Sequence, residues 1–159
     1  MILRRIKNPW LKKDGYNCIG CSPDNPLGFH LCFFEDGDYV LTQWNPTQNH
    51  QGWIDTLHGG VQGLLIDEVA GWVVTRKLQT TGVTSKMEVK YLKPVMTTGG
   101  TITVRARVSK QMRNIAFISA QLLNANDEVC TEAELVYFCA SKEKALEQVG
   151  FSGCELEEE

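Results

Sequence analysis

The stretch LHGGVQGLLIDEVAGWVV, Leu57 to Val74, decides the fold. It holds no proline, and apolar residues continue at helical spacing as far as Leu78, after which Gly82 closes the polar run Gln79-Thr-Thr. This pattern predicts one long apolar helix from about Gly59 to Leu78. Two features are unusual for a core helix: it opens on His58-Gly59-Gly60, and it carries an acid, Asp67, in its middle.

The acid lies one helical turn from two glycines, Gly63 and Gly71, on an otherwise apolar face. Each glycine costs about 1 kcal/mol of helix stability relative to alanine. Their placement therefore indicates that a ligand, a backbone segment or a second helix approaches there. Two interpretations of Asp67 stay open at this point: a functional carboxylate, or a buried acid satisfied by hydrogen bonds or by an arginine.

The His58-Gly59-Gly60 start also carries information. The first turn of a helix has free N–H groups, and its dipole favours negative charge. Glycine removes the Cβ, so a ligand oxygen can reach these groups, as an oxyanion site for an acyl carbonyl requires. A phosphate would suit the same N–H groups, and a plain turn into a helix is the alternative without a ligand.

The spacing of the two features predicts an oligomer. Gly59 and Asp67 are eight residues apart, so they lie roughly 12 Å apart along one helix. One small carbonyl cannot contact both. If both act in one site, they must come from different chains, because two antiparallel copies of the helix would place Asp67 of one chain near Gly59 of the other. On the catalytic interpretation the spacing therefore predicts a homodimer with two interfacial sites.

Around the helix the chain alternates with the period of strands. A hairpin is predicted first, with arms at about 28–34 and 39–44 and a turn at Glu35–Asp38. After the helix, Val83 and its alternate residues to Tyr91 are apolar or small, and their neighbours are polar. Further strands are predicted at 101–108, 115–123 and 129–140, and a short helix at 142–149.

This order predicts an α+β class, in which a curved antiparallel sheet wraps around one long central helix. The 159 residues are expected to form a single domain, 1–159, with an irregular N-terminal segment at about 1–27 and an acidic flexible tail at about 150–159. Without the four glutamates of residues 155–159, 16 basic residues face 15 acidic ones, and no nucleic-acid motif appears. The chain shows no membrane span and no secretory signal, so a cytoplasmic location and no membrane partner are expected.

The six cysteines do not predict a metal site. Cys18 and Cys21 form a Cys-x-x-Cys pair, but a zinc site would need a second ligand pair at short spacing, and none follows. His30 or Cys32 could complete such a site. In a reducing compartment free thiols are the favoured interpretation, so no metal and no cofactor are expected.

Three segments together resemble one family. They are Leu57-His-Gly-Gly60 with Leu65-Ile-Asp-Glu68, the strand GVTSKMEVKYLKPV at 82–95, and NCIGCSPDNPLG at 17–28. Over about residues 17–140 they resemble, in order, the hotdog-fold acyl-CoA thioesterases of the phenylacetate-pathway (PaaI-like) type. The resemblance implies a hotdog fold, homodimers that often pair into homotetramers, and hydrolysis of a thioester between an acyl group and coenzyme A, which enters only as part of the substrate.

The resemblance also assigns roles by position. Asp67 is expected to activate water as a general base, or to act as the nucleophile. The Gly59 N–H, within the His58-Gly59-Gly60 turn, is expected to polarise the carbonyl, and His58 to orient the loop or contact substrate. Thr84 matches a Ser or Thr that helps hold the attacking water.

One position departs from the family. Where several members carry an asparagine six residues before the histidine, this chain has Gly52, beside Gln51, which could serve instead. The change keeps a second function open: a non-catalytic acyl-CoA-binding or sensing protein on the same fold. A hotdog dehydratase is disfavoured because its hydration motif is missing, and a structural protein stapled by zinc at Cys18 and Cys21 is a further alternative.

Contacts to the rest of the substrate are predicted from charge and aromaticity. Residues 86–113 carry seven Lys or Arg against one Glu, and Lys90, Arg105 and Arg107 are expected near the coenzyme A phosphates. Trp53, in the loop before His58, is expected to line the acyl pocket. A short, medium or aromatic acyl group fits this picture, and the thiol carrier could be coenzyme A or acyl carrier protein.

Overall fold

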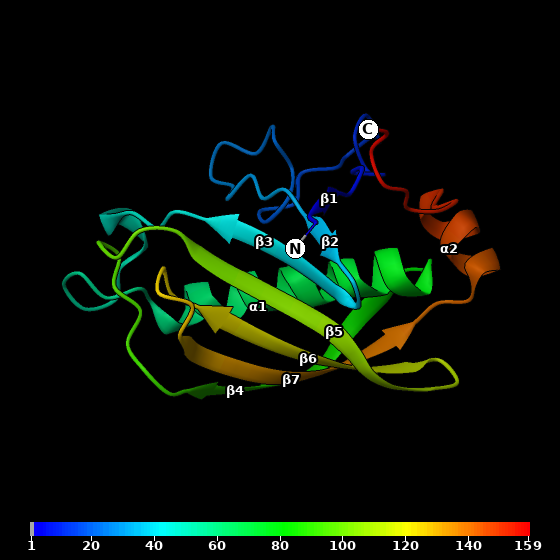
Figure 1. Ribbon diagram of the computed structural model, residues 1–159. Coiled ribbons are helices and arrows are strands. Elements are labelled where there is room, and N and C mark those ends of the chain that lie inside the picture. The colour runs from blue at the N-terminus through cyan, green and yellow to red at the C-terminus, as the bar shows by residue number, and fades with distance from the viewer. Residues whose placement is uncertain (1) are drawn as a thin grey trace.

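A long helix, held in the curve of a seven-stranded antiparallel sheet, organises the molecule. The computed structural model describes residues 2–159, so Met1 of the predicted domain lies outside the described residues. The helix is α1 (Gly59–Val73), prolonged by the π-helical turn η2 (Val74–Leu78). The strand order is β1-β2-β3-β5-β6-β7-β4. The predicted α+β architecture is confirmed (Figure 1).

The elements follow the chain in nearly the predicted order. They are β1 (Arg4–Arg5), β2 (Phe34–Asp36), β3 (Tyr39–Trp44), η1 (Gln48–His50), α1, η2, β4 (Gly82–Tyr91), β5 (Ile102–Met112), β6 (Ile115–Leu123), β7 (Val129–Cys139) and α2 (Lys142–Val149). The Ser141 hydroxyl caps α2 by accepting from the Lys144 N–H, and Gly150 ends it with a φ of 66°. The limits of α2 are those that the sequence predicts.

The core lies between α1 and the concave face of the sheet. Leu65, Ile66 and Val69 of the helix are fully buried, as are Val104 and Ile118 of the strands. Burying one such side chain stabilises the fold by about 1.5–3 kcal/mol relative to leaving it exposed. The alternation of each strand supplies the matching apolar face, which is why one helix is enough to close the core.

The predicted strand at 28–34 was wrong in its limits. Strand β2 begins only at Phe34, and residue 35 continues it, so the turn is at Gly37 and Asp38. Before Phe34, the chain bonds to N-terminal residues instead: the Leu31 N–H donates to the Gly20 carbonyl, and the Phe33 carbonyl accepts from the Ile6 N–H. These irregular partners use the backbone groups that a longer hairpin would need.

The C-terminal residues pair with the N-terminal strand region. Leu156 forms an antiparallel bridge with Ile6, and the Glu157 N–H donates to the Arg5 carbonyl. Nearby, Phe151 is 3% exposed and stacks on Trp10 with ring centroids 5.4 Å apart. The two ends of the chain therefore lie on the same side of the molecule, as Figure 1 shows, and the segment predicted as a tail has contacts up to Glu157.

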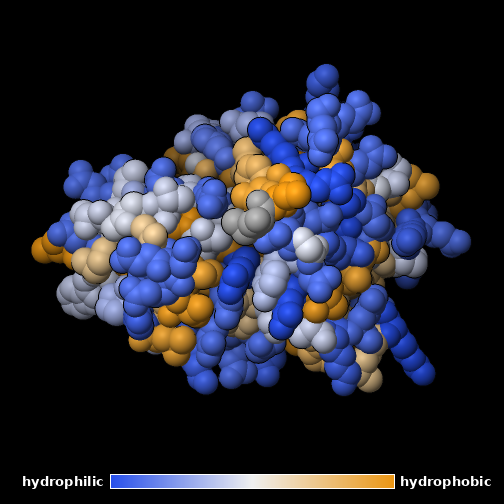
Figure 2. All heavy atoms as spheres, viewed as in Figure 1, coloured by the Kyte–Doolittle hydropathy of each residue, from blue (hydrophilic) through white to orange (hydrophobic). Residues whose placement is uncertain are grey.

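Strand β4 differs from the other long strands. Among residues 2–159 it pairs only with β7, so its other edge has no strand beside it. Nine of its ten residues are exposed, including apolar Val83 and Tyr91. On the face seen in Figure 2, by contrast, hydrophilic residues cover much of the surface and apolar residues gather in separate patches. No helix in the described part of the chain is long and apolar enough to cross a membrane.

Candidate functional site

The carboxylate of Asp67 is held by two hydroxyl groups from different strands. Thr84 of β4 donates to Asp67 Oδ1 over 2.7 Å, and Tyr137 of β7 donates to the same oxygen over 2.6 Å. The Tyr137 hydroxyl also lies 2.8 Å from the main-chain oxygen of Asp67. Among residues 2–159 no hydrogen bond to Oδ2 is found. One oxygen is thus anchored, and the other has no hydrogen-bond partner in this part of the chain, where Asp67 lines a cavity of about 370 Å³.

Thr84 reaches the helix because of a β-bulge. Strict alternation from Val83 to Tyr91 would place Thr84 on the opposite face from Met87. The pairing of β4 with β7 shifts between Thr84 and Lys86, so Ser85 is an extra residue. One extra residue changes which face the following side chains occupy. The bulge therefore brings Thr84 onto the helix-facing side, where it meets Asp67.

Tyr137 is a site residue that the sequence analysis missed. It lies on β7 and is 2% exposed. Burial, followed by the hydrogen bond to Asp67, raises the pKa of its hydroxyl far above the ordinary value. The hydroxyl therefore stays protonated and remains a donor to the carboxylate. The available signal was its place in the alternation after Ala133 and Leu135, which puts Tyr137 on the face toward α1.

The start of α1 has the geometry of an anion site. His58 is the N-cap, and its Nδ1 accepts from the Gly60 N–H over 2.8 Å. No acceptor for the Gly59 N–H is found in the described part of the chain. A Cβ on Gly59 would lie 3.3 Å from the Tyr91 ring and hydroxyl, so glycine permits this close approach. His58 is thus the side chain that shapes the turn, and Gly59 offers the free donor.

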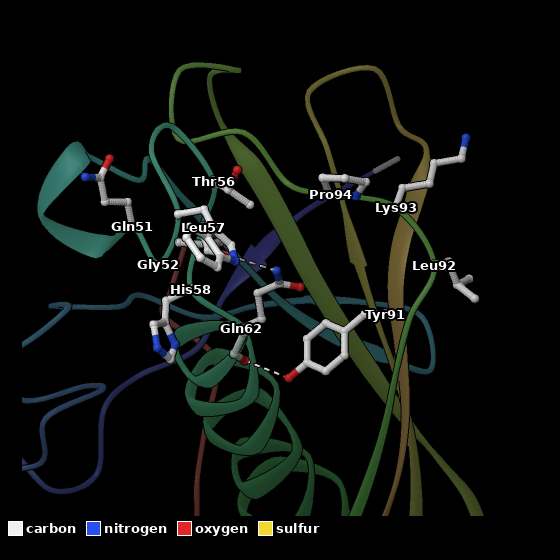
Figure 3. A pocket seen from close by; sticks show the side chains of 12 residues that line it. Gln51, Gly52, Thr56, Leu57, His58, Gln62, Tyr91, Leu92, Lys93 and Pro94 are labelled. Atoms are coloured by element: carbon white, nitrogen blue, oxygen red, sulfur yellow. Dashed lines mark hydrogen bonds between the residues drawn. The ribbon is translucent and has the colours of Figure 1, made fainter.

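A cavity of about 730 Å³ opens at this turn, between the loop 51–58 and the end of β4. Figure 3 shows Tyr91 reaching from β4 to the first turn of α1, where its hydroxyl donates to the Gly59 carbonyl over 2.8 Å. This bond ties the His58-Gly59-Gly60 turn to the sheet. Tyr91 is a second residue that sequence reasoning did not single out. Its place in the pattern of β4 marked it only as an apolar-face residue.

Within one chain, Asp67 and Gly59 do not meet. They lie eight residues apart on the same helix, roughly 12 Å along its axis. Each has its own partner on β4: Thr84 at one end for Asp67 and Tyr91 at the other for Gly59. A single chain therefore keeps the Asp67–Thr84 contact and the Gly59–Tyr91 contact apart.

The sequence is similar to known thioesterases over the helix and the strands that follow it. The family model described as the thioesterase superfamily matches residues 55–131. Acyl-coenzyme A thioesterase 13 from Homo sapiens is 30% identical over 86 residues, as is the protein of the same name from Pongo abelii. The match covers 54% of this chain and 61% of each relative, so the chain spans less than two thirds of their length.

Solved structures agree on the architecture. Zebrafish thioesterase superfamily member 2 superposes with a TM-score of 0.63 at 24% identity, covering 72% of this chain and 88% of that one. A Streptococcus mutans protein, solved bound to acetyl CoA, superposes with a TM-score of 0.63 at 18% identity, covering 70% and 90%. This chain therefore has the hotdog fold that these solved structures share.

The basic residues predicted for the coenzyme lie on the outer face of the hotdog sheet. Arg105 and Arg107 follow the outward positions of β5 and stand over the Tyr39 ring at 5.0 and 5.4 Å. Arg105 also donates to Gln121. Lys90 and Arg107 line a hollow of about 320 Å³ on this face. The sheet separates these side chains from Gly59 of the same chain, so their role in binding stays a prediction.

The loop before the hotdog helix contains the remaining predicted residues. The Gln51 Oε1 accepts from the Asp55 N–H over 3.0 Å and so stabilises the loop itself. Trp53 is 85% exposed at the rim of the 730 Å³ cavity. A Cβ on Gly52 would lie 3.2 Å from the His58 ring, so a side chain at position 52 would stand directly against His58. The structure thus places all three at the cavity near Gly59.

Proposed function

We propose that this hotdog protein is a thioesterase that hydrolyses acyl-CoA to free acid and coenzyme A. The observation that carries the proposal is the anchored carboxylate: two hydroxyls fix Asp67 Oδ1 and leave Oδ2 available. A positioned general base contributes about 10²–10⁴-fold to a rate. Oδ2 would take a proton from water as the water oxygen attacks the thioester carbonyl. Direct attack by the carboxylate, with a mixed anhydride hydrolysed afterwards, is the other route open to Asp67.

The negative charge that develops on the carbonyl oxygen needs a donor. The free Gly59 N–H at the positive end of α1 supplies one, and the dipole of the helix adds to it. Collapse of the tetrahedral intermediate breaks the C–S bond and releases the coenzyme A thiolate, which takes up a proton. Because Gly59 and Asp67 of one chain are too far apart, we assign the donor and the base of one site to different protomers.

The order of contacts along α1 and β4 supports a particular dimer. Asp67 contacts Thr84, and Gly59 contacts Tyr91. Between them, Gly63 faces Met87, whose methyl carbon would lie 3.4 Å from a Cβ placed on Gly63. A two-fold axis beside Gly63 and Met87 would therefore bring Asp67 of each protomer near Gly59 of the other. The second protomer would also cover the open edge of β4, and unpaired edge strands favour pairing with another chain. This arrangement would form two complete sites per homodimer, and a dimer of dimers would extend it to a homotetramer.

The charged part of the substrate has a candidate binding surface on the sheet. Lys90, Arg105 and Arg107 lie on the outward face. Coenzyme A bound at the site of a neighbouring protomer would place its phosphates against these side chains. Trp53 at the cavity rim and the His58-Gly59-Gly60 turn would contact the acyl end. The relative solved with acetyl CoA shows that a hotdog protein of similar shape binds such a molecule, which supports coenzyme A as the thiol carrier.

A panel of thioesters tests the proposal. It should run from acetyl-CoA to long acyl-CoA, with benzoyl-CoA, phenylacetyl-CoA and an acyl carrier protein thioester. Asp67→Asn should lower kcat about 10²–10⁴-fold. Asp38→Asn is the matched control, because Asp38 is exposed in the β2–β3 turn. Loss of thioester absorbance should be followed directly, since the six thiols of the protein would react with a thiol-trapping dye.

A non-catalytic acyl-CoA binder is the second candidate function. The observation that favours it is Gly52, which brings no side-chain amide to the turn, together with Gln51, whose oxygen is engaged in the loop. Binding of acyl-CoA without turnover by the wild type would support this function and contradict hydrolysis. In that case Gly52→Asn is the variant to test for gained activity.

A further inference from the structure

The N-terminal loop places two cysteines against the buried side of α1. Cys18 Sγ lies 3.3 Å from Glu68 Oε1, and Cys21, which is 6% exposed, lies beside both. One ligand atom from each of Cys18, Cys21 and Glu68 lies within 4.8 Å of the others. The sequence analysis sought a second Cys or His pair at short spacing. The third donor comes instead from a glutamate 50 residues after Cys18, which only the fold brings near.

Gly20 lies directly against the Glu68 side chain. A Cβ at position 20 would lie 2.4 Å from Glu68 Cδ and 2.7 Å from Glu68 Oε2, distances that no real Cβ contact tolerates. Gly20 is itself buried. In this arrangement, the absence of a side chain at position 20 leaves the space that the Glu68 carboxylate occupies beside the two cysteines.

The donor atoms are also held in place by their surroundings. The Cys21 N–H points at Cys18 Sγ over 3.4 Å, which favours a thiolate there. The Tyr16 hydroxyl lies 2.8 Å from Cys21 Sγ, and Trp72 Nε1 donates to Glu68 Oε1 over 3.3 Å. Outer hydrogen bonds of this kind orient metal ligands in proteins. No ion pair found among residues 2–159 includes Glu68, so no side-chain cation balances this group.

We propose that Cys18, Cys21 and Glu68 bind one Zn²⁺ ion. Zinc accepts two thiolates and one carboxylate in a tetrahedral site, with water in the fourth position. Bonds of about 2.3 Å to sulfur and about 2.1 Å to oxygen put tetrahedral ligand atoms roughly 3.6 Å apart. The 3.3 Å between Cys18 Sγ and Glu68 Oε1 is close to this separation. Magnesium and calcium prefer oxygen ligands, so a site with two sulfur ligands disfavours both of these ions.

The ion would connect the N-terminal loop to the wall of the candidate active site. Cys18, Cys21 and Glu68 line a cavity of about 370 Å³ together with Asp67 and Tyr137. Zinc would fasten the loop at 17–28 to α1 one residue away from Asp67. The zinc proposal does not depend on thioester hydrolysis, because its ligands Cys18, Cys21 and Glu68 are not the residues that we assign to the reaction.

Metal content of the whole chain tests the proposal. The protein should be purified under a reducing agent, mixed with excess zinc, desalted and measured by inductively coupled plasma mass spectrometry. The wild type should retain one zinc per chain. Cys21→Ser and Glu68→Gln should each lose most of it, while Cys32→Ser should keep it, because Cys32 is exposed and outside the cluster. Circular dichroism of each variant checks folding, and Cys18→Ser serves if another variant does not fold.

Two further measurements distinguish the outcomes. Cobalt in place of zinc should give a thiolate charge-transfer band that disappears in Cys21→Ser, and EDTA should lower the Tm of the zinc-loaded wild type but not that of Cys21→Ser. Wild type that retains no more zinc than Cys21→Ser would overturn the proposal. Full zinc retention in Glu68→Gln would overturn the assignment of the third ligand.

Discussion

The hydroxyl of Tyr137 should matter both to stability and to turnover. Tyr137→Phe keeps the buried ring and removes one donor that lies 2.6 Å from Asp67 Oδ1 and 2.8 Å from the Asp67 carbonyl. A hydrogen bond to a charged group contributes about 1.5–3 kcal/mol. Thr84 remains as the second donor, so part of the anchor survives. We expect the free energy of unfolding to fall by about 2 kcal/mol.

The same change should lower kcat about 10–100-fold. A carboxylate held by one donor samples orientations in which Oδ2 no longer contacts the attacking water. Small misplacements of a catalytic group reduce the rate by factors of this size. Urea denaturation gives the first quantity, and steady-state hydrolysis of the best acyl-CoA gives the second. Tyr39→Phe is the control: it also loses one hydroxyl, but on the outer face of the sheet. Equal kcat for the two variants would refute the anchoring of the base by Tyr137, even if Tyr137→Phe were less stable.

Three other changes test the fold around the site. Burial alone would raise the pKa of Glu35, but hydrogen bonds from Arg76 and a nearby lysine outweigh it and lower that pKa. The pair therefore stabilises the protein above the unfolded-state pKa, and this contribution is lost as pH falls through the folded-state value. Glu35→Gln should cost about 2 kcal/mol at neutral pH and much less in acid, and equal losses in urea melts at both pH values would contradict this. His58→Ala removes the cap on the Gly60 N–H and should cost about 1 kcal/mol, which a Tm equal to that of wild type would exclude. Gly150→Ala forces a side chain into φ 66° and should cost roughly 1 kcal/mol, measured by thermal unfolding.

The large elements were predictable because local pattern and tertiary role agree. The apolar run from Leu57 has nowhere to be buried except inside the sheet, and the strands from β5 to β7 each supply an alternating apolar face. The strand at 28–34 failed for a different reason. Its composition suits a strand, but its backbone partners are loop residues such as Gly20. Partner identity is a tertiary property that composition does not carry.

The site was predictable only in part. Asp67 stood out because an acid in an apolar helix needs an explanation. The structure places it in contact with Thr84, and the roles of both residues stay predictions. Strict alternation would nevertheless have pointed Thr84 away from the helix, since a one-residue bulge at Ser85 is not visible in the period of the sequence. Tyr137 was missed because a tyrosine on an apolar strand face looks like core until a polar partner is placed opposite it.

Two neighbouring acids on one buried helix now have separate explanations. Successive helix residues point about 100° apart, so Asp67 turns toward β4 and β7 while Glu68 turns toward the N-terminal loop. Each meets groups suited to a carboxylate: hydroxyls for Asp67, and for Glu68 the Trp72 indole together with, in the metal-free protein, the Cys18 thiol. A buried acid without such partners would destabilise the helix. The strand bulge that brings Thr84 to Asp67 and the glycine beside Glu68 are therefore the local features that let one apolar helix carry two acids.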